Sequence, residues 1–237
     1  MKIFIATPMY GGNCTGTYAN SLMQVPGALY NHDIDMQYRY LTNDALITRA
    51  RNQLTYDFIQ SDCTHLMFID ADIGFNAQDI PYMMSLNEDI VCGIYPKKCI
   101  NWNTVATAAI QGFSPSELSN HTGDFVVNYY DKVDNGLITI ENGGTGFMLI
   151  KRNVITTLIP KVDSYMFDGY NQVDVANGLQ SYRIPEIFNT CICPITYRLL
   201  SEDYYFCKLT RDNGYKIKAD TNIKLTHTGS YVFNGTI

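Results

Sequence analysis

The first hundred residues alternate short apolar runs with stretches of helical periodicity, and this alternation restricts the possible folds more than any other feature of the chain. Runs such as residues 3–6 and 65–69 are apolar almost throughout, which is typical of strands buried on both faces. Strands that alternate with helices form a mostly parallel sheet with helices on both faces. The expected strands are residues 3–6, 36–41, 65–69 and 89–94, and the expected helices are residues 16–30, 44–60 and 78–86.

Local signals set the element boundaries. Pro8 is expected to end the first strand in a loop, because proline has no N–H to donate to a sheet. Thr42 or Asn43 is the expected cap of the helix over residues 44–60. The apolar positions of that helix recur at helical spacing and are expected to face the sheet; they are Leu46, Ile47, Ala50, Leu54 and Phe58.

Beyond residue 98 the pattern loosens. Residues 99–136 are polar and predict loops, with antiparallel strands over 125–130 and 137–141. A small-residue segment, Gly143-Gly144-Thr145-Gly146, precedes the next apolar run. The remaining expected elements are a strand over 147–150, a short helix from Asn153, an irregular segment over 160–190, and a last helix between an N-cap at Ser201 and a C-terminal Gly214.

Composition argues against two classes of partner. The 237 residues are 46% hydrophobic, so a packed core is available. The formal net charge is −6 and no run of Lys and Arg exceeds a pair, which argues against nucleic acid. No apolar stretch reaches membrane-spanning length, and the apolar N-terminal run is too short for a signal peptide. The seven cysteines lack zinc-site spacing, so we expect free thiols and a cytoplasmic protein, in the host cytoplasm if it is viral.

Two carboxylates follow the strand over residues 65–69. The apolar run leads directly into Asp70-Ala71-Asp72, at the carboxyl end of the strand, where open α/β sheets bind ligands. Mg²⁺ and Mn²⁺ prefer oxygen ligands, usually one or two carboxylates and substrate phosphates. Aspartates also end strands and cap turns for purely structural reasons. Because no basic residue adjoins them in the sequence, we interpret Asp70 and Asp72 as a metal site facing a diphosphate.

The Asp70-Ala71-Asp72 string resembles the DxD motif of GT-A-fold glycosyltransferases and is similar to family-2-like enzymes of bacteria, phages and large viruses. The resemblance implies one catalytic domain over residues 1–237. Its Rossmann-like half, residues 1–98, would bind the nucleotide-sugar, and residues 99–237, with a smaller antiparallel sheet, would bind the acceptor. Three further segments resemble the family in order and spacing: Thr7-Pro8, Arg49-Ala50-Arg51-Asn52 and Thr226-His227-Thr228-Gly229.

The resemblance also implies roles for the matched residues. A divalent ion, Mn²⁺ or Mg²⁺, is expected on Asp70, Asp72 and His227. The catalytic base is expected at the start of the last helix, as Asp203 or Glu202, with Asp203 favoured. Arg49 is favoured over Arg51 because it shares a helix face with Asn52. The residues expected to contact the nucleotide-sugar are Thr7, Pro8, Tyr10, Arg49, Asn52, Asp70, Ala71 and Gly144.

The implied reaction moves a sugar from a UDP- or GDP-linked donor to a hydroxyl of a carbohydrate or other acceptor, with inversion. Several alternatives stay open at this point. The sequence of a haloacid-dehalogenase-like phosphatase also contains an apolar strand followed by a DxD motif, whose first aspartate is the nucleophile. A nucleotidyltransferase and a non-catalytic sugar-binding protein with a transferase-like fold are the others. His227 also fits a surface imidazole, and acidic residues in a first helical turn are stabilised by the helix dipole alone.

Overall fold

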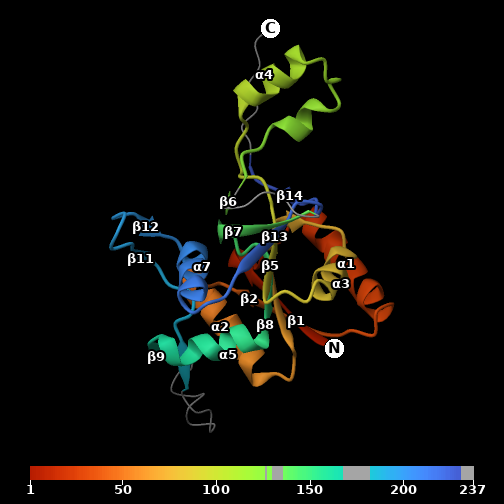
Figure 1. Ribbon diagram of the computed structural model, residues 1–237. Helices are drawn as coiled ribbons and strands as arrows, with labels where there is room; N and C mark the ends of the chain where they lie inside the picture. Colours follow the sequence, from red (N-terminus) through yellow and green to blue (C-terminus); the bar gives the residue numbers. More distant parts are fainter. Residues whose placement is uncertain (126, 130–135, 168–181, 231–237) are drawn as a thin grey trace.

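A single mixed sheet forms the centre of the computed structural model, which describes residues 1–125, 127–129, 136–167 and 182–230 (Figure 1). Among these residues the sheet has eight strands in the order β2-β1-β3-β8-β5-β13-β7-β6. The strands are β1 (Lys2–Met9), β2 (Asp35–Thr42), β3 (His65–Ile69), β5 (Ile90–Gly93), β6 (Val127–Tyr129), β7 (Leu137–Gly143), β8 (Phe147–Lys151) and β13 (Ile217–Asp220).

Most strands of the sheet run in one direction. β1 is parallel to β2 and β3, and β5 is parallel to β13. β8 is inserted antiparallel between β3 and β5, and β7 and β6 form an antiparallel edge. The expected α/β class with a mostly parallel central sheet is therefore confirmed. Three two-stranded antiparallel sheets accompany it: β9 (Ser164–Met166) with β10 (Arg183–Pro185), β11 (Cys191–Ile192) with β12 (Leu199–Leu200), and β4 (Ile73–Gly74) with β14 (Thr226–His227).

Helices cover both faces of the sheet, because successive strand residues point to opposite sides. Ile3 and Ile5 pack with residues of α1 and α3, whereas Phe4 and Ala6 pack with residues of α2, α5 and α7. Figure 1 shows the two groups of helices on either side of the sheet. Their bounds are α1 (Gly16–Tyr30), α2 (Ile47–Gln60), α3 (Asp79–Ser85), α5 (Arg152–Leu158) and α7 (Glu202–Asp212); short 3₁₀ turns are η1 (Tyr10–Gly12), η2 (Leu118–His121) and η3 (Ile159–Lys161).

The two halves of the chain share this sheet. β8 and β13, from the second half, flank β5 from the first half on its two sides. The antiparallel strands expected near residues 125–130 and 137–141 are confirmed as β6 and β7. In the expected irregular segment over 160–190, η3, β9 and β10 are present, and residues 168–181 lie outside the described residues.

Two predicted boundaries are wrong. β1 continues through Pro8 to Met9, since its pairing with β3 ends at Ala6 and proline is tolerated where a strand has one neighbour. α2 begins at Ile47 rather than residue 44, and neither Thr42 nor Asn43 caps it. The Asp44 side chain accepts the backbone N–H of Leu46 instead, forming a turn before the helix.

Leu46 and Ile47 are also wrongly assigned to the core. They are 56% and 40% exposed, because the turn before α2 carries them away from the sheet, whereas Ala50, Leu54 and Phe58 are buried as expected. At the other end of the chain, Ser201 does precede α7, but its hydroxyl contacts Asp203 rather than a backbone N–H.

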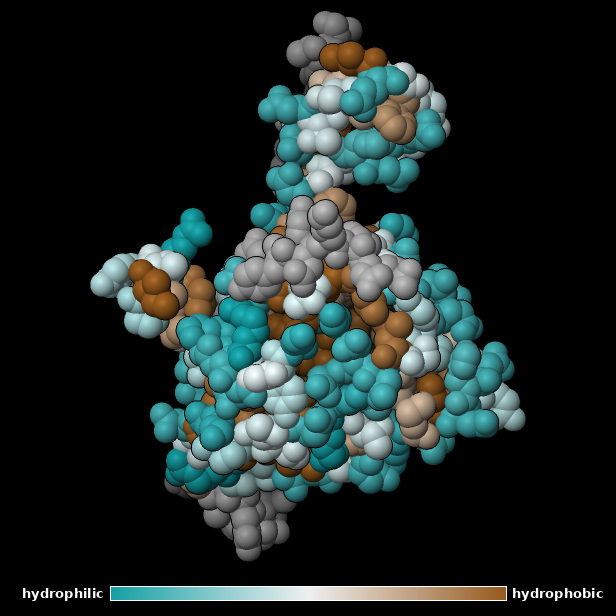
Figure 2. Space-filling view, viewed as in Figure 1, coloured by the Kyte–Doolittle hydropathy of each residue, from teal (hydrophilic) through white to brown (hydrophobic). Residues whose placement is uncertain are grey.

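A helix occupies part of the segment expected to form loops. This helix, α4 (Trp102–Ile110), is capped by Asn101, whose side chain accepts the backbone N–H of Thr104. Only Ala108 of α4 is buried, so the sequence lacks the apolar periodicity that identifies a helix. The helix projects from the body of the molecule in Figures 1 and 2.

No helix in the described ranges has both the length and the apolar character needed to cross a bilayer. All seven cysteines are free thiols.

Candidate functional site

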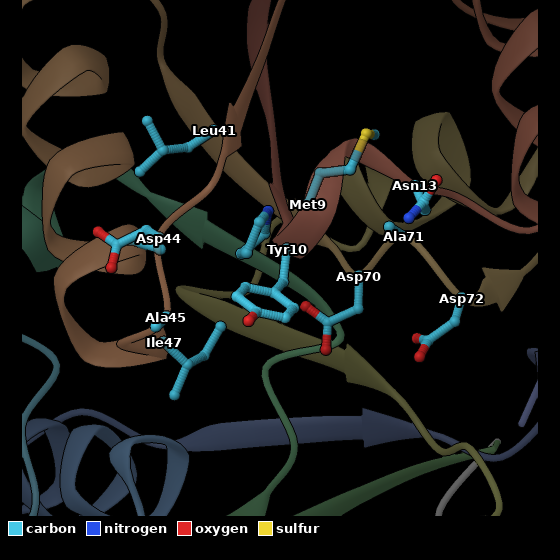
Figure 3. Close-up of a pocket in the computed structure, with 12 residues that line it drawn as sticks. Met9, Tyr10, Asn13, Leu41, Asp44, Ala45, Ile47, Asp70, Ala71 and Asp72 are labelled. Carbon is cyan, nitrogen blue, oxygen red and sulfur yellow. The ribbon is translucent and has the colours of Figure 1, made fainter.

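The carboxyl end of β3 opens onto a cavity of about 390 Å³. Asp70 and Asp72 follow the strand and form one side, while the turn and first residues of α2 form the other (Figure 3). Parallel strands β1 and β3 end at the same edge, so the segment after β1 completes the wall. The lining residues are Pro8, Met9, Tyr10, Asn13, Leu41, Asp44, Ala45, Ile47, Ala50, Asp70, Ala71 and Asp72.

Asp70 is held in place by Arg51. The Arg51 Nη2 group donates to both carboxylate oxygens of Asp70, at 3.0 and 3.3 Å, and its Nε lies 3.4 Å from Glu202 Oε1. Arg51 therefore joins the end of β3 to the start of α7. The Asp70 backbone N–H donates to the Gly146 carbonyl at 2.9 Å, which fixes the aspartate from a second direction.

Arg51 is buried among these charges, with a side chain only 3% exposed. Burial by itself would lower the pKa of Arg51, but the negative charges of Asp70 and Glu202 outweigh it and raise the pKa. The guanidinium also lies 5.2 Å from the centre of the Phe68 ring, a cation–π distance. Arg51 Nη1 is buried with no hydrogen-bond partner among the described residues, as is Thr145 Oγ1.

The preference for Arg49 over Arg51 is not supported by these positions. Arg49 lies on the exposed side of α2 and forms an ion pair with Asp44 at 2.9 Å. Asn52 does not share its environment: it is buried, and its amide both donates to and accepts from the Phe188 backbone. Asn52 thereby anchors the segment before β11 on α2.

Asp72 is surrounded by two basic side chains. Lys98 Nζ contacts its Oδ2, and His227 Nε2 lies 3.5 Å from its Oδ1. Burial alone would raise the pKa of Asp72, but hydrogen bonds from His227 and Lys98, with the charge of Lys98, lower it to about 2. Although no basic residue adjoins the aspartate pair in the sequence, folding brings Arg51 to Asp70 and Lys98 to Asp72.

The orientation of His227 suits a metal ligand. Its Nδ1 lies 2.8 Å from the Pro96 carbonyl oxygen, which can only accept, so Nδ1 carries the proton. Nε2 lies on the Asp72 side of the ring and donates to that carboxylate when the ring is protonated; in the neutral ring its lone pair would be available to a metal ion. A carbonyl that accepts from the other ring nitrogen is usual for metal-bound histidine. One carboxylate and one imidazole beside an open cavity fit Mn²⁺ or Mg²⁺ completed by phosphate oxygens. Among the described residues, no cluster of three or more His, Cys, Asp or Glu side chains gathers as a ready-made metal site.

Tyr95 lies between His227 and the glycine-rich segment. Its hydroxyl accepts the Gly146 backbone N–H at 3.1 Å, and its ring meets His227 edge-on at 5.3 Å. Burial raises the pKa of Tyr95, and the charges of Asp70 and Asp203 act in the same direction. A Cβ atom at Gly144 would lie 2.0 Å from the hydroxyl oxygen, so tyrosine packing by itself requires glycine there.

Gly146→Ala is expected to lower the free energy of unfolding by about 1–3 kcal/mol, the usual cost of overpacking a buried position. The new Cβ would lie 2.8 Å from the Tyr95 hydroxyl and 2.9 Å from Asp70 Oδ2, and Arg51 prevents the carboxylate from moving away. Urea denaturation measures the change. The control is Gly27→Ala inside α1, where a Cβ meets nothing within 4 Å and stability should rise by about 0.5–1 kcal/mol. Equal effects of the two substitutions would contradict the packing described for Gly146.

The two acidic residues at the start of α7 have different partners. Glu202 pairs with Arg51. One oxygen of Asp203 accepts the Ser201 hydroxyl and, at 2.8 Å, the Tyr204 backbone N–H; no hydrogen bond to the other oxygen is found in the described part of the chain. The second carboxylate oxygen of Asp203, which lies near Tyr95, can therefore accept a hydrogen bond or a proton. The carboxylate of Glu202, by contrast, is in the ion pair with Arg51.

The structure places some of the expected site residues at the cavity and others away from it. Pro8, Tyr10, Asp70, Ala71 and Asp72 line the cavity, and His227 lies beside Asp72. Thr7 does not line it: its side chain is fully buried and lies 2.6 Å from the Tyr18 hydroxyl. Three residues of the site were not singled out from the sequence as its functional members, namely Arg51, Tyr95 and Lys98. The only sequence signal for Tyr95 and Lys98 is their position just after the strand over 89–94, the same edge at which Asp70 follows its strand.

No protein-family model and no curated protein matches the sequence. Among solved structures, the chain is similar to a protein from STIV, at 16% identity over 97% of this chain and 87% of that chain, with a TM-score of 0.49. It is also similar to a glycosyltransferase involved in the glycosylation of the major capsid of PBCV-1 (12% identity, 66% and 63% of the two chains, TM-score 0.33). A third similarity is to CMP:2-keto-3-deoxy-manno-octonic acid synthetase complexed with CTP (10% identity, 92% and 89%, TM-score 0.41). These TM-scores are too low to support conclusions about function, which rest on the site itself.

Proposed function

We propose that this protein is a metal-dependent GT-A-type glycosyltransferase that moves a sugar from a UDP- or GDP-linked donor to a hydroxyl of a carbohydrate or other acceptor. The observation that carries the proposal is the pairing of Asp72 with His227 just after the carboxyl end of β3, where Asp70 and Asp72 both line a cavity of about 390 Å³. Nucleotide ligands of α/β sheets bind at this edge. The cavity volume falls in the range of small-molecule sites.

Asp72 and His227 would hold the divalent cation, with the donor diphosphate supplying further oxygen ligands. Such a cation neutralises the charge that develops on the leaving diphosphate. Asp70 has a different role in the proposal, because both of its oxygens accept from the buried guanidinium of Arg51, whereas Asp72 faces the partly exposed Lys98 and a histidine that can itself bind the cation. In the proposal, Asp70 fixes this side of the cavity through its contacts with Arg51, and the donor binds beside Asp70, Ala71 and Tyr10. This engagement of Asp70 also weighs against a phosphatase, which would need that carboxylate free as a nucleophile.

Asp203 is the proposed catalytic base. As the acceptor oxygen forms its bond to the anomeric carbon, Asp203 takes the hydroxyl proton, and the bond to the donor diphosphate breaks with its electron pair on the diphosphate. Direct attack from the side opposite the leaving group inverts the anomeric centre. Asp203 is preferred to Glu202 in the proposal because the Glu202 carboxylate is in an ion pair with the buried Arg51.

The test is a thermal-stability screen of UDP-, GDP- and TDP-sugars with and without Mn²⁺. One donor is expected to raise Tm by about 3–5 °C when Mn²⁺ is present at saturating ligand. Asp72→Asn should lose the metal-dependent part of the shift, since it removes a ligand charge. Asp62→Asn is the matched control, because Asp62 is exposed and pairs with Lys2 outside the cavity. If no nucleotide-sugar shifts Tm in the presence of Mn²⁺, the transferase proposal is wrong.

A further inference from the structure

The ammonium of Lys98 lies beside Asp72, at the position that a metal ion bound by this carboxylate would occupy. The ammonium contacts Asp72 Oδ2, while His227 faces Oδ1 of the same carboxylate. Lys98 therefore supplies, from within the chain, a positive charge on one of the two residues proposed as metal ligands. The Lys98 side chain is still 43% exposed, so its ammonium end has solvent beside it into which it can move.

The Lys98 stem is held in this position by the C-terminal segment. A Cβ atom at Gly229 would lie 2.9 Å from Lys98 Cδ, so the lysine stem packs directly on the glycine backbone. The same segment is fixed to both sides of the site: Thr228 N–H donates to the Asp72 carbonyl at 2.9 Å, and His227 bonds Pro96. The contact between Lys98 and Asp72 is thus a feature of packed elements rather than of two loose surface side chains.

An ammonium and a divalent cation compete for the same carboxylate oxygen, because the two positive charges repel each other at contact distance. We propose that Lys98 is a second cation of the donor site: it neutralises Asp72 until a divalent cation binds, and it then pairs with the donor diphosphate. The inference rests on the proposed function, since it needs a diphosphate donor. Lysine is a common point-charge ligand of phosphate, so the released ammonium has a chemically matched partner.

The first test measures binding of Mn²⁺ alone, from the electron paramagnetic resonance signal of the free ion. Lys98→Met keeps the stem and removes the competing charge, so Mn²⁺ should bind about threefold to tenfold tighter than to the wild type. Lys97→Met is the matched control, with the same change at the neighbouring exposed position, and should leave Mn²⁺ affinity unchanged. Gly229→Ala should also tighten Mn²⁺ binding, because it displaces the lysine stem without removing the charge.

The second test measures binding of UDP and GDP by calorimetry at saturating Mn²⁺. Here the effect should reverse: Lys98→Met should bind the nucleoside diphosphate about threefold to tenfold more weakly, whereas Lys97→Met should match the wild type. The inference is supported if Lys98→Met binds Mn²⁺ more tightly than the wild type and the nucleoside diphosphate more weakly.

Unchanged or weaker Mn²⁺ binding by Lys98→Met overturns the inference, and so does unchanged diphosphate binding. The absence of Mn²⁺ binding to every variant overturns it as well. Failure of the transferase proposal is a separate result, in which the wild type binds no nucleotide-sugar at all.

Discussion

Asp203→Asn is expected to lower kcat for donor turnover by about 100- to 10,000-fold, the usual contribution of a general base. The amide keeps the size of the side chain and can still accept from Ser201 and from the Tyr204 N–H, so the start of α7 should stay intact. What it loses is the ability to take a proton from the attacking hydroxyl. Asp203 is not among the residues that line the cavity proposed to hold the donor, so the KM for the donor should change little.

Donor hydrolysis provides the measurement without a known acceptor, because water then replaces the acceptor hydroxyl. Release of the nucleoside diphosphate is followed by chromatography for the donor found in the thermal screen. Glu202→Gln is the informative comparison, since Glu202 pairs with Arg51 and should affect stability more than kcat. If Asp203→Asn retains the wild-type kcat, or if Glu202→Gln lowers kcat more than Asp203→Asn does, then Asp203 is not the catalytic base.

Arg51→Met is expected to lower the free energy of unfolding by about 3–4 kcal/mol, near the lower end for loss of one partner in a buried ion pair. Methionine approximates the stem but leaves Asp70 and Glu202 facing each other without the guanidinium between them. Their side chains keep some contact with solvent, 28% and 15% exposed, which is why the expected loss is not larger. Urea denaturation at pH 7 measures it.

Two further variants make the Arg51 prediction specific. Arg49→Met removes a half-exposed arginine of the same helix from its ion pair with Asp44 and should cost less than about 1 kcal/mol. Adding Asp70→Asn to Arg51→Met should recover part of the lost stability, because it removes one of the unpaired charges. Equal losses for the two arginine variants, or a further loss in the double variant, would contradict the role given to Arg51.

The sequence alone determined the class of the fold. Buried strands read as continuous apolar runs, and helices that pack on one side keep a period of 3.6 residues, so both signals are local. α1 over residues 16–30 and β3 over 65–69 match their predicted ranges for this reason. α4 was not predicted, since an exposed helix with one buried residue has no periodic apolar face.

The candidate site was predicted only in part. The aspartate pair was found because it adjoins its strand, and that placement follows from the sequence itself. His227 was placed by its resemblance to a family motif, and its contact with Asp72 needs the pairing of β14 with β4.

Which cations neutralise the aspartates was decided by the tertiary structure alone. Arg51 reaches Glu202 across 151 positions of sequence, and Lys98 reaches Asp72 across 26. Arg49 and Arg51 lie on the same helix, and no local signal distinguishes the exposed one from the buried one. The choice depends on the side of α2 that meets β3 and α7. The sequence therefore determines which groups the chain contains and the local elements that carry them, while the distances between their charges exist only after distant strands have paired and the helices have packed.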